Sequence, residues 1–189
     1  ERKIVAAIDS YKQAIKIKPD YAEAYFNMGI SLQERGDLNA AIDSYKQAIK
    51  IKPDYADAHN NMGISMQERG DLNAAMKSYK KALKINPDYA GIYYNIGNSL
   101  KEKGDLNAAI DNYNQAIKLK HDYAEAYHSM GIALEKKGAL DHAILSYAQA
   151  IKFKHDYEAA QVDILHQQAH ICDWLRIKED QKLILSLGL

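Results

Sequence analysis

The chain has 189 residues, of which 47% are hydrophobic and 26% are charged, a composition typical of a folded globular protein. Its 25 Lys and Arg residues balance its 25 Asp and Glu residues, so no positive net charge favours nucleic acid or an anionic membrane as a partner. A single cysteine, Cys172, excludes a disulfide within the chain, and no apolar run approaches the length of a bilayer span. We therefore expect a cytoplasmic protein, and the absence of an initial Met suggests a piece of a longer one.

A period of 34 residues organises the sequence. Pro19, Pro53 and Pro87 follow one another at this spacing, and His121 and His155 continue it, each followed by Asp-Tyr as the prolines are. A period of this length predicts repeats that each pack on their neighbours. The chain divides into a half repeat, four full repeats and a divergent end, at residues 1–21, 22–55, 56–89, 90–123, 124–157 and 158–189.

Each full repeat is predicted to form two helices joined by a short turn. In residues 22–55, Tyr25, Met28 and Leu32 share one face of the first helix. Gly36 then ends this helix, because glycine accepts a left-handed backbone, and we expect Asp37 to cap the next helix.

Small and aromatic residues recur at fixed positions in the repeats. A glycine inside a helix costs about 1 kcal/mol relative to alanine, so its recurrence at one register predicts close contact between helices. These glycines are Gly29, Gly63, Gly97 and Gly131. Two tyrosine columns are expected to fill the core. They are Tyr11, Tyr45, Tyr79, Tyr113 and Tyr147, and Tyr21, Tyr55, Tyr89, Tyr123 and Tyr157.

The period, the first-helix residues Tyr25, Met28, Gly29 and Leu32, and the later Pro53 resemble the tetratricopeptide repeat family. The resemblance implies an all-α solenoid: antiparallel helix pairs stacked in a right-handed superhelix, with the first helices lining a groove. Residues 158–189 would form a capping helix pair, which solenoids require at their ends.

A row of small polar side chains lies on the expected groove face. An amide offers donors and an acceptor, so a row of them can bond the backbone of an extended polypeptide without selecting its sequence. The alternative is that these amides bond locally to the neighbouring helix. The row is Asn27, Asn61, Asn95 and Ser129.

Further groove positions extend this candidate site. A mixed aromatic and polar row suits stacking and adaptable contacts, and one more amide stands in a row otherwise filled by isoleucine. These positions are Phe26, Asn60, Tyr94 and His128, with Asn98. Glu23, Asp57 and Glu125 form an acidic row, which we interpret as helix capping rather than as a rim that prefers basic segments.

Nothing in the sequence favours catalysis or a cofactor in this chain. The glycines are isolated and form no phosphate-binding loop. His166 and His170, with Cys172 close behind, have a spacing that can bind a metal, but we favour an ordinary polar helix face and expect no metal.

The divergent end adds a second resemblance. The segment from His166 to Trp174, following an asparagine row, is similar to the junction between repeats and catalytic region in O-linked N-acetylglucosamine transferases. That resemblance implies an acceptor-recognising arm whose UDP-GlcNAc-dependent domain is absent here. Two alternatives stay open: a stand-alone adaptor, or end-to-end self-association through residues 1–21, where Ile4, Ile8 and Tyr11 lack a partner helix.

Overall fold

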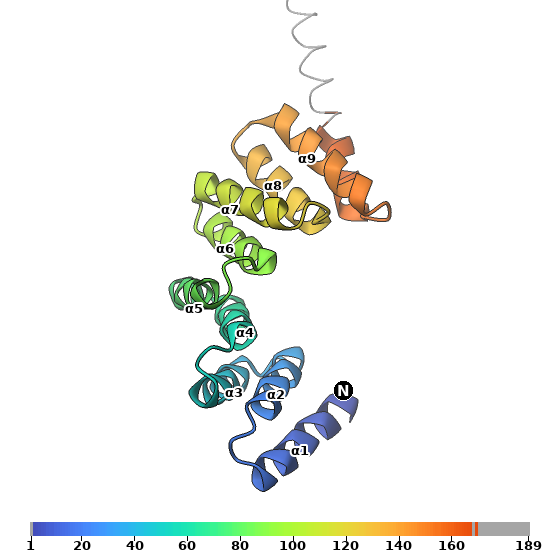
Figure 1. Cartoon of the computed structure of the whole chain (residues 1–189). Coiled ribbons are helices and arrows are strands. Elements are labelled where there is room, and N and C mark those ends of the chain that lie inside the picture. Colours follow the sequence, from blue (N-terminus) through green and yellow to red (C-terminus); the bar gives the residue numbers. More distant parts are fainter. Residues whose placement is uncertain (1, 168, 170–189) are drawn as a thin grey trace, which may run out of the picture. The chain divides into compact units, whose positions relative to one another are not determined.

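A computed structural model of the chain describes residues 2–167 and 169 and contains no strand within them (Figure 1). The helices are α1 (Arg2–Ile17), α2 (Ala22–Glu34), α3 (Leu38–Ile51), α4 (Ala56–Glu68), α5 (Leu72–Ile85), α6 (Ala90–Glu102), α7 (Leu106–Leu119), α8 (Ala124–Lys136) and α9 (Leu140–Phe153). Residues 158–167 are also helical. The expected all-α repeat fold is confirmed, and no described helix has the length and apolarity needed to cross a membrane.

The helices form two compact units, one of residues 1–104 and one that begins at Asp105. In the first unit, α2 pairs with α3 and α4 with α5, while α1 packs on α2, α3 on α4 and α5 on α6. Figure 1 shows these helices following one another from α1 in blue to α6 in green. In the second unit, α8 packs on both α7 and α9. Within each unit, the helices therefore contact chiefly their neighbours in sequence, as expected for a repeat protein.

Glycine ends the first helix of each repeat, as the sequence predicts. Gly36 has φ +87°, and the equivalent Gly70 has φ +91°. The turn closes through two backbone hydrogen bonds: the Gly36 N–H donates to the Gln33 carbonyl at 2.8 Å, and the Asp37 N–H donates to the Leu32 carbonyl at 2.9 Å. A side chain in this left-handed conformation would be strained, which explains the glycine.

The prediction that Asp37 caps α3 is wrong. Its side chain makes no bond to the start of the helix. The carboxylate instead accepts a hydrogen bond of 2.6 Å from Arg35 Nε, because a nearby guanidinium is a stronger donor than a backbone amide. Asp105, which has a lysine at the arginine position, does cap its helix and accepts from Ala108 N at 3.2 Å.

The glycines within the first helices are explained by close contact with tyrosine rings. A Cβ atom placed on Gly29 would lie 2.5 Å from Cε1 of Tyr45, and one on Gly63 would lie 2.5 Å from Cε1 of Tyr79. Tyr45 and Tyr79 are fully buried. Tyr113 and Tyr147 are fully buried as well, so the prediction of core tyrosines is confirmed at four positions of this column, whereas Tyr11 is only half-buried.

The second tyrosine column differs from expectation. Tyr21 is 40% exposed, and Tyr55 is only half-buried. Each lies beside a lysine of the preceding helix end: Lys18 Nζ is 5.2 Å from the Tyr21 ring centroid, and Lys52 Nζ is 4.7 Å from that of Tyr55. These rings therefore combine edge packing with cation–π contact rather than filling the core.

Candidate functional site

The predicted groove residues of the first unit lie on three helices in contact. Helix α4 contacts both α2 and α6. The residues are Phe26 and Asn27 on α2, Asn60 and Asn61 on α4, and Tyr94, Asn95 and Asn98 on α6. His128 and Ser129 lie on α8 in the second unit.

Part of the amide row bonds within the protein. Asn95 Nδ2 donates to Asn60 Oδ1 at 2.9 Å, and Asn60 Nδ2 donates to Asn61 Oδ1 at 3.2 Å. Asn60 is only 5% exposed, so it is the buried residue that connects Asn95 with Asn61. Asn61 and Asn95 are half-buried. Since each amide offers two donor hydrogens and two acceptor sites, both keep bonding capacity beyond these contacts.

Asn27 differs from the other two asparagines of its row. It is half-buried, and its amide makes no side-chain hydrogen bond to any residue that the structure describes. The adjacent Phe26 has no polar atom to offer, and its ring packs 4.8 Å from the Tyr55 ring centroid. Asn27 is therefore the member of the row whose whole amide is available to a ligand.

A depression of about 380 Å³ lies between α2 and α4. It is lined by Ile30, Gln33, Glu34, Asn61, Ile64 and Glu68. The two isoleucines are half-buried and form an apolar floor, whereas the two glutamates are exposed. Sequence reasoning identified Asn61 but missed the glutamine and both glutamates. Their signal was their recurrence in the last turn of successive first helices.

A chain of hydrogen bonds holds one wall of this depression. Tyr45 Oη donates to Gln33 Oε1 at 3.1 Å, and Gln33 Nε2 donates to Glu68 Oε1 at 3.0 Å. Burial is the main cause that raises the pKa of the Tyr45 hydroxyl; a bond with the Asn61 side chain opposes it, and the Glu68 and Glu34 carboxylates add to it. The phenol therefore stays protonated and donates, and the bonds join α3, α2 and α4.

The same chain recurs one repeat later. Tyr79 Oη donates to Gln67 Oε1 at 3.0 Å, and Gln67 Nε2 donates to Glu102 Oε1 at 2.6 Å. Ser99 Oγ adds a third bond to Gln67 Oε1 at 2.8 Å. These bonds join α5, α4 and α6, so the wall of the groove is ordered along the first unit.

The acidic row does not cap its helices, contrary to the interpretation from sequence. Glu23 and Asp57 lie in the first turns of α2 and α4, but neither carboxylate accepts a hydrogen bond from a backbone N–H in the described residues. Burial raises the pKa of the Tyr89 hydroxyl, and the nearby Asp57 carboxylate raises it further through its charge and hydrogen bonding. In the second unit, Glu125 pairs with Lys154 at 3.5 Å. Asp57 and Glu125 thus interact with residues at helix ends, since Tyr89 directly precedes α6 and Lys154 directly follows α9.

In the second unit, the predicted site residues take part in packing. Ser129 is only 6% exposed. His128 Nε2 lies 2.7 Å from Asp163 Oδ2, and His128 Nδ1 lies 3.1 Å from Tyr157 Oη. Asp163 occupies the repeat position of the asparagine row, so this contact fastens helical residues 158–167 to α8 as Asn95 is fastened to Asn60.

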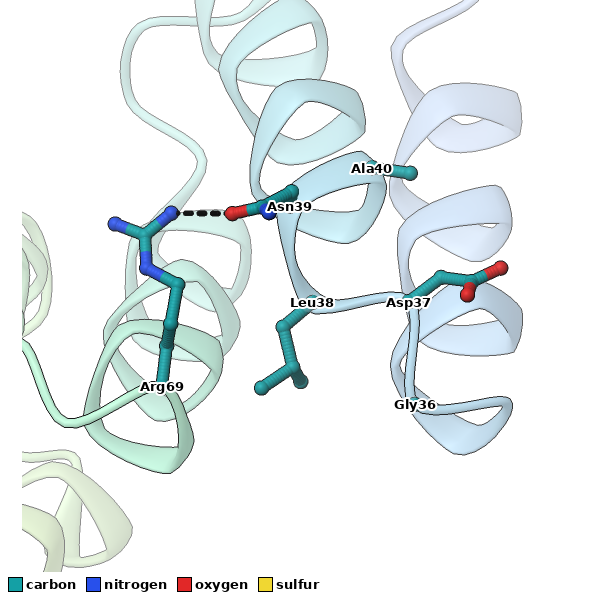
Figure 2. Close-up of a pocket in the computed structure, with 6 residues that line it drawn as sticks. All are labelled: Gly36, Asp37, Leu38, Asn39, Ala40 and Arg69. Carbon is teal, nitrogen blue, oxygen red and sulfur yellow. Dashed lines mark hydrogen bonds between the residues drawn. The ribbon is translucent and has the colours of Figure 1, made fainter.

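A second depression lies at the turn between α2 and α3, away from the predicted site residues. Figure 2 shows Arg69 reaching from the next repeat toward this turn, where its Nη1 donates to Asn39 Oδ1 at 2.6 Å. Lys103 Nζ makes the equivalent bond to Asn73 at 2.9 Å. Basic residues of the turns thus join one repeat to the one before it, which leaves them occupied by structural bonds.

No metal-binding group of three or more His, Cys, Asp or Glu side chains occurs among the described residues. His170 and Cys172 lie outside the described residues, as does most of the segment that resembles the glycosyltransferase junction. The second helix of the expected capping pair lies outside them too.

The chain is similar to several solved helical repeat proteins. The crystal structure of MamA matches with 28% identity over 80% of this chain and 89% of that one, with a TM-score of 0.73. YrrB, described as a TPR protein with an unusual peptide-binding site, matches with 18% identity, 86% and 84% coverage and a TM-score of 0.69. TTC0263, described as a thermophilic TPR protein in Thermus thermophilus, matches with 21% identity, 88% and 91% coverage and a TM-score of 0.72. At the two lower identities the likeness shows the fold alone.

Family models give the assignment directly. No curated protein matches the chain significantly. A model described as TPR repeat matches residues 3–34, 31–68, 67–104 and 97–138, and one described as tetratricopeptide repeat matches residues 124–161. Together these matches span nearly all of the described residues, so the chain belongs to the tetratricopeptide repeat family.

Proposed function

We propose that this protein–protein interaction module binds an extended polypeptide along the face formed by α2, α4 and α6. The observation that supports this best is the depression between α2 and α4, whose isoleucine floor and polar wall suit a peptide side chain and its backbone. YrrB, a protein of the same fold, is itself described as having a peptide-binding site. The binding residues we propose are Asn27, Asn61, Asn95, Asn98, Phe26 and Tyr94.

Backbone hydrogen bonding would supply much of the affinity. An extended polypeptide presents one N–H and one C=O at each residue, and both need partners once water is excluded. Asn27 has its whole amide available, and Asn61 retains capacity at the wall of the depression. The floor of Ile30 and Ile64 would accept an apolar side chain between them. Such a site selects extended chains broadly, with limited discrimination of sequence.

Selection from a random peptide library tests this proposal. Peptides selected on the wild-type chain should bind at least roughly tenfold more weakly to Ile64→Ser, because that change removes the apolar floor. Asn27→Ala should weaken them several-fold without lowering Tm, because its amide has no structural bond among the described residues. Lys80→Ala, a change at an exposed position of α5, is the matched control.

Two results would count against the groove. A failure to select any peptide that depends on Ile64 would remove the proposal. An equal loss of binding and of folding in Asn27→Ala would mean that this asparagine is structural.

A separate proposal is that this chain is the acceptor-recognising arm of an O-linked N-acetylglucosamine transferase. It rests on the sequence of residues 166–174 and on the asparagine row, with a catalytic domain supplied elsewhere in the natural gene product. A sugar-transfer assay on that product, with UDP-GlcNAc as donor, tests it. The absence of transfer would leave the chain as an adaptor or scaffold.

Self-association is the second candidate. The expectation that Ile8 lacks a partner is wrong, because Ile8 is buried in a cluster with Leu32 of α2, but another face of α1 favours the idea. Ala7, Tyr11 and Ala14 on α1 are half-buried, although their counterparts on α3, at Ala41, Tyr45 and Ala48, are fully buried under α2. A second copy could cover this face of α1. Light scattering over a wide concentration range tests the idea: Tyr11→Glu should abolish a concentration-dependent increase in mass, and a wild-type monomer throughout would rule it out.

A further inference from the structure

Charge is divided unevenly between the helices of the first unit. Helices α2 and α4 carry four carboxylates, Glu23, Glu34, Asp57 and Glu68, and no Lys or Arg. The helices that pack behind them are basic by contrast: α5 alone carries four lysines and no acid. The balanced charge of the whole chain therefore conceals an excess of negative charge on α2 and α4.

Two of these carboxylates line the depression itself. Glu34 and Glu68 end α2 and α4, and both are exposed at the rim above the isoleucine floor. The C-terminal end of a helix carries the negative end of its dipole, so two helix ends add to the two carboxylates. A cation that enters between α2 and α4 meets negative potential from all four sources.

These carboxylates are not neutralised within the described part of the chain. Glu68 receives a hydrogen bond from the neutral amide of Gln33, and Glu34 has no ion pair or hydrogen bond there. The nearest basic residues in sequence are occupied elsewhere. Arg35 pairs with Asp37, and Arg69 pairs with Asp71 while also donating to Asn39. The rim thus keeps two carboxylates available to a ligand.

We propose that the partner segment places a Lys or Arg, flanked by apolar residues, in the depression between α2 and α4. The methylene stem of such a side chain packs on Ile30 and Ile64 while its charged end reaches Glu34 and Glu68. The backbone beside it meets the amide of Asn61. This inference rests on the proposed function and adds the class of residue that the groove selects.

The preference for a Lys or Arg of the partner should be strongest between α2 and α4. In the corresponding pair of α4 and α6, Asn98 takes the place of Ile64, and Lys101, next to Glu102 on α6, adds a positive charge of a kind that α2 and α4 lack. The surface between α4 and α6 is therefore less acidic and less apolar than the depression between α2 and α4. One basic residue of the partner is consequently selected, rather than a regular series of them.

The library selection tests this inference when it is repeated with charge variants. Glu34→Gln with Glu68→Gln removes both rim charges and keeps the side-chain size. Asp9→Asn with Asp43→Asn removes two charges from exposed positions on α1 and α3, away from the groove, and is the matched control. Both double variants change the net charge equally.

Lys and Arg should be enriched in the peptides selected on the wild-type chain. At low salt these peptides should bind roughly tenfold more weakly to the Glu34/Glu68 variant, and acetylation of the peptide lysine should cause a similar loss. Binding to the Asp9/Asp43 control should stay within roughly twofold of wild type. Raising the salt concentration should reduce the difference in affinity between the wild type and the Glu34/Glu68 variant, because salt screens exposed ion pairs.

Failure of the inference can be distinguished from failure of the proposed function. Peptides that require Ile64 but bind equally to wild type and to the Glu34/Glu68 variant would overturn the basic preference and leave the groove in place. A selection that yields no peptide dependent on Ile64 would overturn the proposed function, and the preference with it.

Discussion

At the scale of single residues, His59 stands where the other full repeats have a tyrosine, at Tyr25, Tyr93 and Tyr127. The imidazole is buried, and its Nε2 lies 3.3 Å from the Pro53 carbonyl oxygen. Its Nδ1 is buried without a hydrogen-bond partner among the described residues. Burial lowers the pKa of His59, the positive charge of Lys81 lowers it further, and the bond to Pro53 opposes both.

The lowered pKa of His59 predicts a pH-dependent stability. The folded chain keeps this histidine neutral, while the unfolded chain protonates it below about pH 6.5, so its contribution is complete above that pH and declines below it. His59→Tyr removes this dependence. Urea unfolding between about pH 8 and pH 5 should show the wild type losing stability relative to the variant, by at most about 1.4 kcal/mol per pH unit. Parallel curves for the two proteins would contradict the assignment.

The buried glycines give a second prediction at this scale. Gly29→Ala or Gly63→Ala gains helix propensity but drives a methyl group into the ring of Tyr45 or Tyr79. Each should destabilise the chain by about 1–3 kcal/mol in urea unfolding, because the ring is packed on all sides. Gly91→Ala in the first turn of α6 is the control, since its Cβ meets only the edge of the half-buried Tyr89 ring at 3.2 Å. Gly29→Ala with unchanged stability would show that the ring can move.

At the scale of elements, two Tyr–Gln–Glu hydrogen-bond chains, one through Gln33 and one through Gln67, each tie three helices together. Gln67 makes three such bonds, to Tyr79, Ser99 and Glu102, whereas Gln33 makes two, to Tyr45 and Glu68. Gln67→Ala should therefore cost more stability than Gln33→Ala, by about 1 kcal/mol, since each loss leaves buried polar groups unpaired. Chemical denaturation measures the loss of stability in each variant. An equal loss, or a larger loss in Gln33→Ala, would contradict these hydrogen-bond chains.

The elements themselves were predictable from sequence, but the bonds between them were not. The helices, their glycine stops and the Tyr45 column follow from local patterns that repeat every 34 residues. The partners of Gln33 and Asn95 lie 35 residues away, on the next or preceding first helix. Which side chains meet there depends on the stagger between successive helices, which no local pattern fixes. The prediction that Asp37 caps α3 was wrong for a similar reason. The turn brings Arg35 next to the Asp37 carboxylate, which therefore bonds the guanidinium instead of the backbone of α3.

At the scale of the whole molecule, the repeats fix what each helix can offer a partner. The second helices bury their tyrosines and alanines, so they contribute the core. The first helices leave Asn27, Ile30 and Ile64 only partly covered, and they alone line the depression between α2 and α4. The asparagine row was visible in the sequence, whereas the acidic rim emerged only once α2 and α4 were placed side by side. The site is thus a product of stacking rather than of any single repeat.

The most direct test of the proposed groove is a methyl NMR titration with the tightest peptide obtained from the library selection. We expect the δ1 methyl signals of Ile30 and Ile64 to shift with increasing peptide, because these methyl groups form the floor of the depression. Signals of Ile51 and Ile85, at the ends of α3 and α5, should stay in place. Shifts confined to Ile51 and Ile85, with those of Ile30 and Ile64 unmoved, would contradict binding at the face of α2, α4 and α6.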